Sequence, residues 1–292
     1  MGHRRLLSAI SVAVGVLVTA GLAAGCGTAS RPNIAGAVGI FTGDIRVGGY
    51  SVTVSCTGRA AGTSPTVVLI AGSTEPLTTF RFIQYRLSAV TRVCSYDRLG
   101  VGTSSKPRAA QTLADTATLL HELVFKLHAA PHGVVLVGHS IGGQVAAQYA
   151  SQYRASGQVK AVVLLDATPP SYVKKTQALI PPAARGIAGA VRSDSVRIAT
   201  GDDPERLVVA GAPPPPVGNI PLIVVQHGRN IFAAVPTYGA RLQQIWSAGQ
   251  REWLRLSTKS QMVVARRSGH AIYLDQPELT LRLIEQALSD AA

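Results

Sequence analysis

One run in the chain combines the features of a strand, a tight turn and a helix start. It is Val134-Val-Leu-Val-Gly138-His139-Ser140-Ile141-Gly142-Gly143, followed by a small-residue segment up to Tyr153. The apolar β-branched stretch predicts a buried strand, and the segment behind it predicts a helix. Gly138 and Gly142 lack the Cβ atoms that would collide in a sharp turn, so the hydroxyl of Ser140 can stand exposed. The spacing predicts Ser140 as a nucleophile, although Gly-x-Ser-x-Gly also occurs in ordinary strand-to-helix turns.

Strands and helices alternate along most of the rest of the chain, which predicts an α/β fold with a mostly parallel sheet covered by helices on both faces. A chain of 292 residues is long enough for one large domain of this kind. The predicted strands are 44–47, 50–56, 66–70, 91–96, 134–137, 161–165, 222–225 and 262–265, and the first two form a hairpin around Gly48-Gly49. The predicted helices are 80–89, 112–128, 142–153, 238–256 and 277–289.

The segment Thr168 to Ile220 breaks this alternation with paired prolines, mixed charges and the run Pro213 to Pro216. We expect it to be an insertion after the sixth strand that forms a cap over the carboxyl edge of the sheet. Open α/β sheets bind their ligands at that edge.

The first 25 residues have the pattern of an export signal: Arg4 and Arg5, an apolar stretch from Leu6 to Leu22, and small residues before Cys26. The end of this segment, Ala23-Ala24-Gly25-Cys26, resembles the lipobox of bacterial lipoproteins, although Leu22 is one place further from the cysteine than the large aliphatic residue of that motif. We prefer lipidation of Cys26; ordinary cleavage nearby and retention as a single membrane anchor are the alternatives. The expected organisation is a signal peptide at 1–25, the lipidated cysteine and a flexible tether at 26–43, and the folded domain at 44–292.

The formal charge of +13 suits contact with an anionic envelope surface. Lys and Arg are scattered, without a basic run or aromatic interleaving, so nucleic acid is not an expected partner. An exported chain with Cys56 and Cys94 left after Cys26 favours a disulfide. No metal or cofactor is expected, because the cysteines lack ligand spacing and no Gly-rich phosphate loop follows a strand.

A serine needs a base to take its proton, and the chain offers seven histidines. His3 lies in the signal, His121 and His128 lie in a predicted helix, His132 precedes the nucleophile strand, and His139 is expected to shape the turn. His227 and His270 each follow a strand. His270 lies after the last strand and before the last helix, where the nucleophile, acid, histidine order of α/β-hydrolases has the base.

The acid that orients His270 is less clearly marked. Asp166 ends the strand after the nucleophile and is the preferred residue. The more frequent position, one strand later, holds Gln226-His227-Gly228-Arg229-Asn230, and Asn230 could orient an imidazole but not stabilise its charge. Asp275 is expected to form a capping box with Glu278, and Asp194, Asp202 and Asp203 remain open.

The last requirement is a pair of backbone N–H groups for an oxyanion. Ile141, after the nucleophile, should supply one, and Ser73, after Gly72 in the loop behind an earlier strand, should supply the other. A plain strand-to-loop turn explains Gly72 and Ser73 equally well.

From about Asp44 to Ala287 the chain resembles the α/β-hydrolase superfamily, in particular exported or membrane-tethered bacterial hydrolases. Several motifs in the right order make the match specific. They are Val54-Ser-Cys-Thr-Gly58, Pro65 to Leu69, Arg92 to Gly102, Val137 to Gly143, Leu164-Leu-Asp166, and Ser268-Gly-His270 with Leu274 to Glu278. Ala71 departs from the histidine found there in many relatives.

The resemblance implies an eight-stranded sheet in the order 1-2-4-3-5-6-7-8, with Ser140 and His270 catalytic and the loop Asp97 to Gly102 as support. Cys56 and Cys94 would lie on neighbouring strands, which makes a bridge between them plausible. The expected function is a serine esterase with a Ser140, His270, Asp166 triad that acts on a small-molecule or lipid ester, tethered to the outer face of the membrane. The alternative is a non-catalytic envelope binding or scaffold lipoprotein on the same fold.

Overall fold

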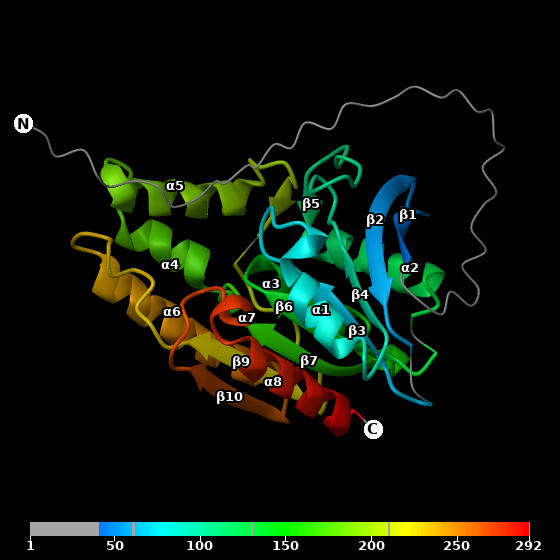
Figure 1. The fold of residues 1–292 in the computed structure, drawn as a ribbon. Helices are drawn as coiled ribbons and strands as arrows, with labels where there is room; N and C mark the ends of the chain where they lie inside the picture. The colour runs from blue at the N-terminus through cyan, green and yellow to red at the C-terminus, as the bar shows by residue number, and fades with distance from the viewer. Residues whose placement is uncertain (1–40, 60–61, 130, 210, 292) are drawn as a thin grey trace, which may run out of the picture. The chain divides into compact units, whose positions relative to one another are not determined.

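The computed structural model describes residues 41–59, 62–129, 131–209 and 211–291 (Figure 1). The predicted signal peptide, Cys26 and most of the predicted tether lie outside the described residues. The first strand begins at Phe41, so Phe41 to Gly43 belong to the predicted hairpin and not to the tether.

An eight-stranded sheet forms the centre of the domain, in the order β1-β2-β4-β3-β6-β7-β9-β10. Only the β1–β2 and β2–β4 pairs are antiparallel. This is the predicted strand order. The strands are β1 (Phe41–Val47), β2 (Tyr50–Thr57), β3 (Thr66–Ile70), β4 (Val93–Tyr96), β6 (Val134–His139), β7 (Val159–Leu165), β9 (Leu222–His227) and β10 (Ser260–Ala265).

Helices cover both faces of this sheet, as predicted. In Figure 1, α1 (Arg81–Leu87) and α8 (Pro277–Asp290) lie side by side in front of it. The other face packs against α2 (Leu113–Lys126) and α3 (Ile141–Gln152). Alternate residues of β3 enter the two cores: Val68 and Ile70 join the α2 and α3 side, while Val67 and Leu69 join the α1 and α8 side.

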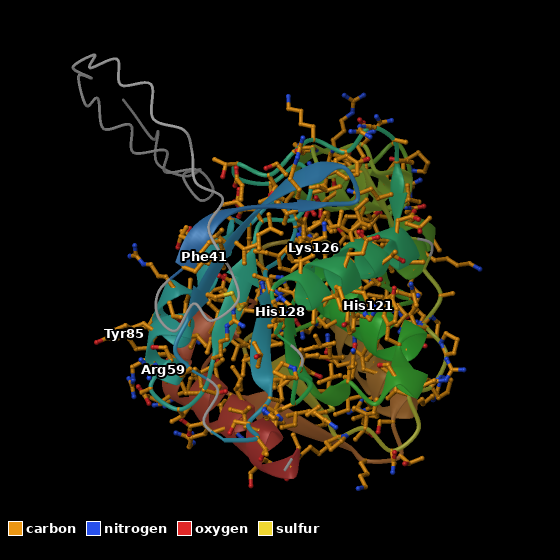
Figure 2. All side chains as sticks on the ribbon, turned by 90° about the vertical axis from the view of Figure 1, so that its right-hand side faces the viewer. Phe41, Arg59, Tyr85, His121, Lys126 and His128 are labelled. Carbon is orange, nitrogen blue, oxygen red and sulfur yellow. A yellow bond between two sulfur atoms is a disulfide. The ribbon has the colours of Figure 1, made fainter. Side chains whose placement is uncertain are left out.

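The hairpin at the edge of the sheet is tied to α2. Figure 2 shows this face, and the Nζ of Lys126 donates to the carbonyl of Arg46 at 2.6 Å. Cys56 and Cys94 are register partners on β2 and β4 and are joined by a disulfide, as expected.

The helix predicted at 80–89 is α1, and a 3-10 turn, η1 (Leu77–Phe80), precedes it. One local prediction needs correction. The expected capping box of Asp275 and Glu278 is absent: Asp275 ends the short helix α7 (Ile272–Asp275), and α8 starts with Pro277 at its first position. A capping box forms instead between Thr112 and Asp115, at the start of α2.

The insertion contains two helices that its mixed composition did not reveal, α4 (Tyr172–Leu179) and α5 (Gly186–Thr200). They pack with α6 (Gly239–Trp253) around a small hydrophobic core of their own, whose buried members are Tyr172, Val173, Ile180, Ala188, Phe232, Val235, Leu242 and Trp246. After α5 in the chain, β8 (Leu207–Val208) pairs with β5 (Gln111–Thr112). These strands are two residues long, too short for periodicity to predict.

Among the described residues, no helix is both long and apolar enough to cross a lipid bilayer.

Candidate active site

Ser140 stands on a strained turn between β6 and α3. Its φ of 52° and ψ of −123° lie in a region that residues with a side chain rarely adopt. A Cβ on Gly138 would collide with the Gly142 carbonyl, and a Cβ on Gly142 would collide with the carbonyls of Ile70 and Ala71. The two glycines therefore serve the function predicted for them, which is to leave room for the sharp turn.

Asp166 and His270 come together at the carboxyl edge of the sheet, Asp166 from the end of β7 and His270 from the loop after β10. The Nδ1 of His270 donates to Oδ2 of Asp166 at 2.7 Å. Asp166 is fully buried, while the His270 side chain is 36% exposed. This bond fixes a proton on Nδ1 and leaves the Nε2 lone pair of His270 free to accept one.

Three further N–H groups surround the Asp166 carboxylate. The backbone N–H of His227 and the indole N–H of Trp246 donate to Oδ1 at 3.2 and 3.0 Å, and Nδ1 of His227 donates to Oδ2 at 2.7 Å. Burial by itself would raise the pKa of Asp166, but the hydrogen bonds from His227 and His270 outweigh it and hold that pKa well below its ordinary value. The carboxylate is therefore ionised although it is buried.

Sequence reasoning did not assign His227 and Trp246 to the site. His227 ends β9, where the more frequent acid position lies, and its Nε2 accepts from the side-chain amide of Gln243 at 2.8 Å. The ring of Trp246 also stands edge-on to the ring of His270, with centroids 5.4 Å apart. In the sequence, the histidine at the end of this strand was the feature that could have indicated a neighbour of Asp166.

The Ser140 hydroxyl hydrogen-bonds Thr168 Oγ1 at 3.3 Å, just after Asp166 in the chain. Within the described ranges, no hydrogen bond joins Ser140 to His270. Catalytic hydrogen bonds are often long in unliganded enzymes and tighten when substrate binds. Burial is the main cause that lowers the pKa of His270 from its ordinary value, and the hydrogen bond to Asp166 opposes this lowering.

Ser73 and Ile141, the predicted oxyanion donors, line one small cavity of about 10 Å³, room for about one water molecule. The rest of its lining is contributed by Ile198, Asp203, Glu205, Leu207 and Val209 of the insertion. The insertion therefore covers this part of the site, as expected of a cap.

The loop carrying Ser73 is fixed from behind by Arg98, which lies in the predicted support loop. Its guanidinium donates to the carbonyls of Ala71 and Gly72 and forms a buried ion pair with Glu205 of the insertion, with Nε 2.7 Å from Oε2. Asp97 next to it accepts from the Leu77 N–H at 2.6 Å. These contacts agree with a supporting role for this loop.

The other candidate acids do not contact His270. Asn230 accepts from the Phe232 N–H, Asp275 accepts from the Gly269 N–H at 2.7 Å, and Asp194 pairs with Arg197. Asp203 lies in the cap, where burial and the neighbouring Glu205 raise its pKa. Asp202 is exposed.

The sequence model of the alpha/beta hydrolase family matches residues 67–283. The chain belongs to the alpha/beta hydrolase family. An uncharacterized protein of Mycobacterium tuberculosis (strain H37Rv) is 38% identical over 95 residues, which are 32% of this chain and 27% of that protein. The alignment therefore covers only a small part of that relative's length.

Solved structures of this alpha/beta hydrolase's fold include a thermophilic esterase from Thermogutta terrifontis and the enol-lactonase from Burkholderia xenovorans LB400. The esterase is 19% identical with a TM-score of 0.59 and covers 86% of this chain and 99% of its own. The lactonase is 17% identical with a TM-score of 0.59 and covers 84% of this chain and 99% of its own. At these identities the likeness concerns the fold.

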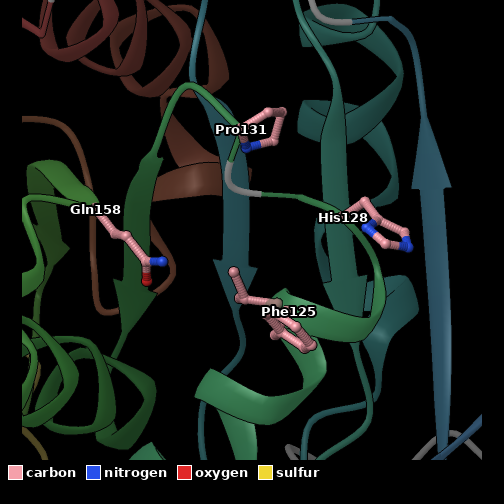
Figure 3. Close-up of a pocket in the computed structure, with 5 residues that line it drawn as sticks. Phe125, His128, Pro131 and Gln158 are labelled. Carbon is pink, nitrogen blue, oxygen red and sulfur yellow. The ribbon is translucent and has the colours of Figure 1, made fainter.

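A wider hollow in this hydrolase lies far from the site. Figure 3 shows a pocket of about 250 Å³ lined by Phe125, His128, Pro131 and Gln158, together with Val124. Pro131 lies shortly before β6 and Gln158 immediately before β7, so the pocket is at the amino edge of the sheet, opposite Ser140. Ligands of such sheets bind at the carboxyl edge, which is where the smaller cavity beside Ile141 lies.

Proposed function

We propose that the protein is a serine hydrolase that cleaves carboxylic esters through a Ser140, His270, Asp166 triad and an acyl-enzyme. The observation that supports this most is the 2.7 Å hydrogen bond between a buried, ionised Asp166 and His270, at the sheet edge where the strained turn presents Ser140. A carboxylate, an imidazole with a free Nε2 and a serine hydroxyl are the parts that acyl transfer needs.

In the first half of the reaction, Nε2 of His270 takes the proton of the Ser140 hydroxyl while Oγ bonds to the carbonyl carbon of the ester. The N–H groups of Ile141 and Ser73 stabilise the negative oxygen that forms. The C–O bond to the alcohol then breaks, and His270 gives its proton to the departing alkoxide. Asp166 stabilises the imidazolium between these two steps.

In the second half, His270 takes a proton from water, and the resulting hydroxide attacks the acyl carbon. The bond to Ser140 Oγ breaks, the serine regains its proton from His270, and the carboxylic acid leaves. The fold shared with an esterase and a lactonase is consistent with this chemistry.

The test is hydrolysis of p-nitrophenyl esters from acetate to palmitate by the full chain in detergent, beside Ser140→Ala. We expect turnover that the substitution abolishes, and a fluorophosphonate probe should label the wild type and not the variant. The chain-length optimum would define the acyl pocket. Turnover that survives Ser140→Ala would contradict the assignment of the nucleophile.

The second candidate is a non-catalytic envelope binding or scaffold protein. Two observations favour it: Ser140 bonds Thr168 instead of His270, and the cavity beside Ile141 holds about 10 Å³. An absence of turnover on every ester together with an absence of fluorophosphonate labelling would support this candidate against the enzyme.

We also propose that the domain works outside the cytoplasm, held to the membrane by a lipid on Cys26. The Cys56–Cys94 disulfide is consistent with an oxidising compartment. Expression with and without Cys26→Ser, followed by fractionation and mass measurement of the mature chain, tests this. Wild type should be in the membrane fraction with a diacylglyceryl mass on Cys26, and the variant should lack that mass.

A further inference from the structure

A second histidine, His139, lies directly before Ser140 at the end of β6 and is 1% exposed. Both of its ring nitrogens face oxygen atoms. Nδ1 is 3.1 Å from Oε2 of Glu75, and Nε2 is 3.1 Å from the backbone carbonyl oxygen of His270. The proposed triad of Ser140, His270 and Asp166 does not use this ring.

The protonation of His139 follows from counting donors and acceptors. A backbone carbonyl oxygen only accepts, so Nε2 must carry a proton. Glu75 accepts the N–H of Gly72 on Oε2 at 2.6 Å and the hydroxyl of Tyr273 on Oε1 at 3.3 Å, which is the pattern of an ionised carboxylate. The contact between Nδ1 and Oε2 is then a hydrogen bond only if Nδ1 also carries a proton.

We propose that His139 is a buried imidazolium paired with Glu75, and that it is a positioning residue for the proposed ester hydrolysis. The pair joins three separate segments of the site. Glu75 belongs to the loop after β3 that carries Ser73, His139 belongs to the nucleophile turn, and the carbonyl it binds belongs to His270. Loss of either proton would break one of these links.

Packing shows that the pair is built into the site. A Cβ on Gly72 would lie 2.7 Å from Oε2 of Glu75 and 3.0 Å from Nδ1 of His139, so only glycine leaves room for the pair there. The ring of Tyr273 stands edge-on to His139, with centroids 5.0 Å apart. Phe80 packs against Tyr273 from the other side.

The charge on His139 also acts on the proposed base. The rings of His139 and His270 are 4.6 Å apart between centroids, and two cations at that distance repel each other. The other ionisable groups around the pair are Glu75, Tyr273, Arg98 behind Gly72, and Asp166 beyond His270. His139 lowers the pKa of His270 more than Glu75 raises it, so the pair adds to the lowering of that pKa by burial, which is the largest cause.

The charge can be measured without any activity. We would record the NMR spectrum of the histidine ring ¹⁵N nuclei in the full wild-type chain in detergent micelles. The His139 signals would be assigned by through-bond correlation. We expect both nitrogens of His139 to carry protons at pH 7. A His139 ring with one protonated nitrogen would overturn the proposal, whether or not the protein hydrolyses esters.

Glu75→Gln tests the positioning role with little change of shape. In Glu75 the single atom Oε2 contacts both the Gly72 N–H and Nδ1 of His139, so a glutamine with its Oε1 at that position keeps both contacts but has no negative charge to stabilise an imidazolium. We expect one of the two ring protons of His139 to disappear from the spectrum. The acid limb of kcat/KM should move to higher pH, so that the variant loses at least about twofold more activity than wild type between pH 8 and pH 5.5.

The control is Glu285→Gln, which removes the same charge from an exposed position on α8 and should leave the pH profile unchanged. A folded Glu75→Gln variant with the wild-type profile would overturn the role in positioning and tuning His270. If wild type hydrolyses no ester, the proposed function fails, and the ring spectrum still decides the charge of His139.

Discussion

Asp166 and His227 are joined by two hydrogen bonds, one from the backbone N–H of His227 at 3.2 Å and one from its Nδ1 at 2.7 Å. Both groups are fully buried. The end of β9 therefore holds a histidine that anchors the carboxylate, and the carboxylate itself comes from β7.

Replacing His227 with Phe should remove the Nδ1 donor and leave Oδ2 of Asp166 bonded to His270 alone. We expect the free energy of unfolding to fall by about 1.5–3 kcal/mol at pH 7, the range for a hydrogen bond to a charged group. His227→Asn places an amide N–H near the position of Nδ1 and should recover much of this. Urea unfolding of both variants is the measurement, and equal losses would contradict the role of Nδ1.

The stability that His227→Phe loses should depend on pH, with a larger loss at neutral pH than in acid. The pKa of Asp166 is lowered by folding, so its stabilising contribution is present above the ordinary carboxyl pKa and is lost as the pH falls toward the folded value. The difference in unfolding free energy between wild type and His227→Phe should therefore be largest near neutral pH and shrink in acid.

The second prediction concerns the proposed base. His270 must be neutral to accept a proton, and its pKa is lowered from the ordinary value of 6.5, so the acid limb of kcat/KM should lie below pH 6.5. Asp166→Asn removes a group that raises this pKa, which should shift the limb further toward acid while kcat falls by about 10³–10⁴. Asp194→Asn is the control in the cap, because Asp194 is about half exposed and pairs with Arg197 outside the site, and a comparable loss of kcat there would count against Asp166 as the acid.

The third prediction uses the strained backbone of Ser140. Glycine adopts a positive φ freely, whereas alanine keeps the strain of a residue with a Cβ. Ser140→Gly should thus be more stable than Ser140→Ala by about 1 kcal/mol, with both inactive. Comparing their urea midpoints tests this, and identical midpoints would mean that the turn is not strained.

The fourth prediction concerns the disulfide, which closes a sequence separation of 38 residues. A loop of that length implies about 4 kcal/mol of stabilisation through the unfolded chain. The double variant Cys56→Ser, Cys94→Ser should lose roughly this amount, and a reducing agent should destabilise wild type but leave the double variant unchanged. Thermal unfolding with and without reductant provides the comparison.

The fifth prediction concerns the buried pair of Arg98 and Glu205, which are 4% and 2% exposed. Glu205→Ala leaves the guanidinium buried without its carboxylate and should cost about 3–5 kcal/mol. The double substitution Arg98→Met, Glu205→Leu should cost clearly less, because no buried charge is left alone. A double variant no more stable than Glu205→Ala would show that the pair acts through its carbonyl contacts.

The parts of the site that the sequence could predict are those set by local spacing. The nucleophile turn depends on glycines two residues either side of Ser140, and the turn is where the pattern put it. The order of the strands came from the resemblance to a family, and the disulfide followed from that order. Asp275 shows the limit of a short pattern, because Pro277 starts α8 and frees Asp275 to bind the Gly269 N–H.

The remaining contacts join residues that are far apart in the chain. Asp166 and His227 are 61 positions apart, and Arg98 and Glu205 are 107 apart. No periodicity links such positions, since the packing of the whole sheet brings them together. The same holds for the helices of the insertion: α4 packs against α5 and α6, and Ile198 of α5 also reaches the core of the sheet.

The hydrophobic core of the insertion has a consequence for how such a protein can diversify. Its buried residues are separate from those of the two cores that hold the sheet, and Trp246 alone among them bonds Asp166. Tyr172 of α4 packs edge-on against Trp246, so changes in this cluster reach the Asp166 carboxylate through one indole ring. The insertion can therefore vary in sequence largely apart from the sheet, and the substitutions expected to disturb Asp166 are those that move Trp246.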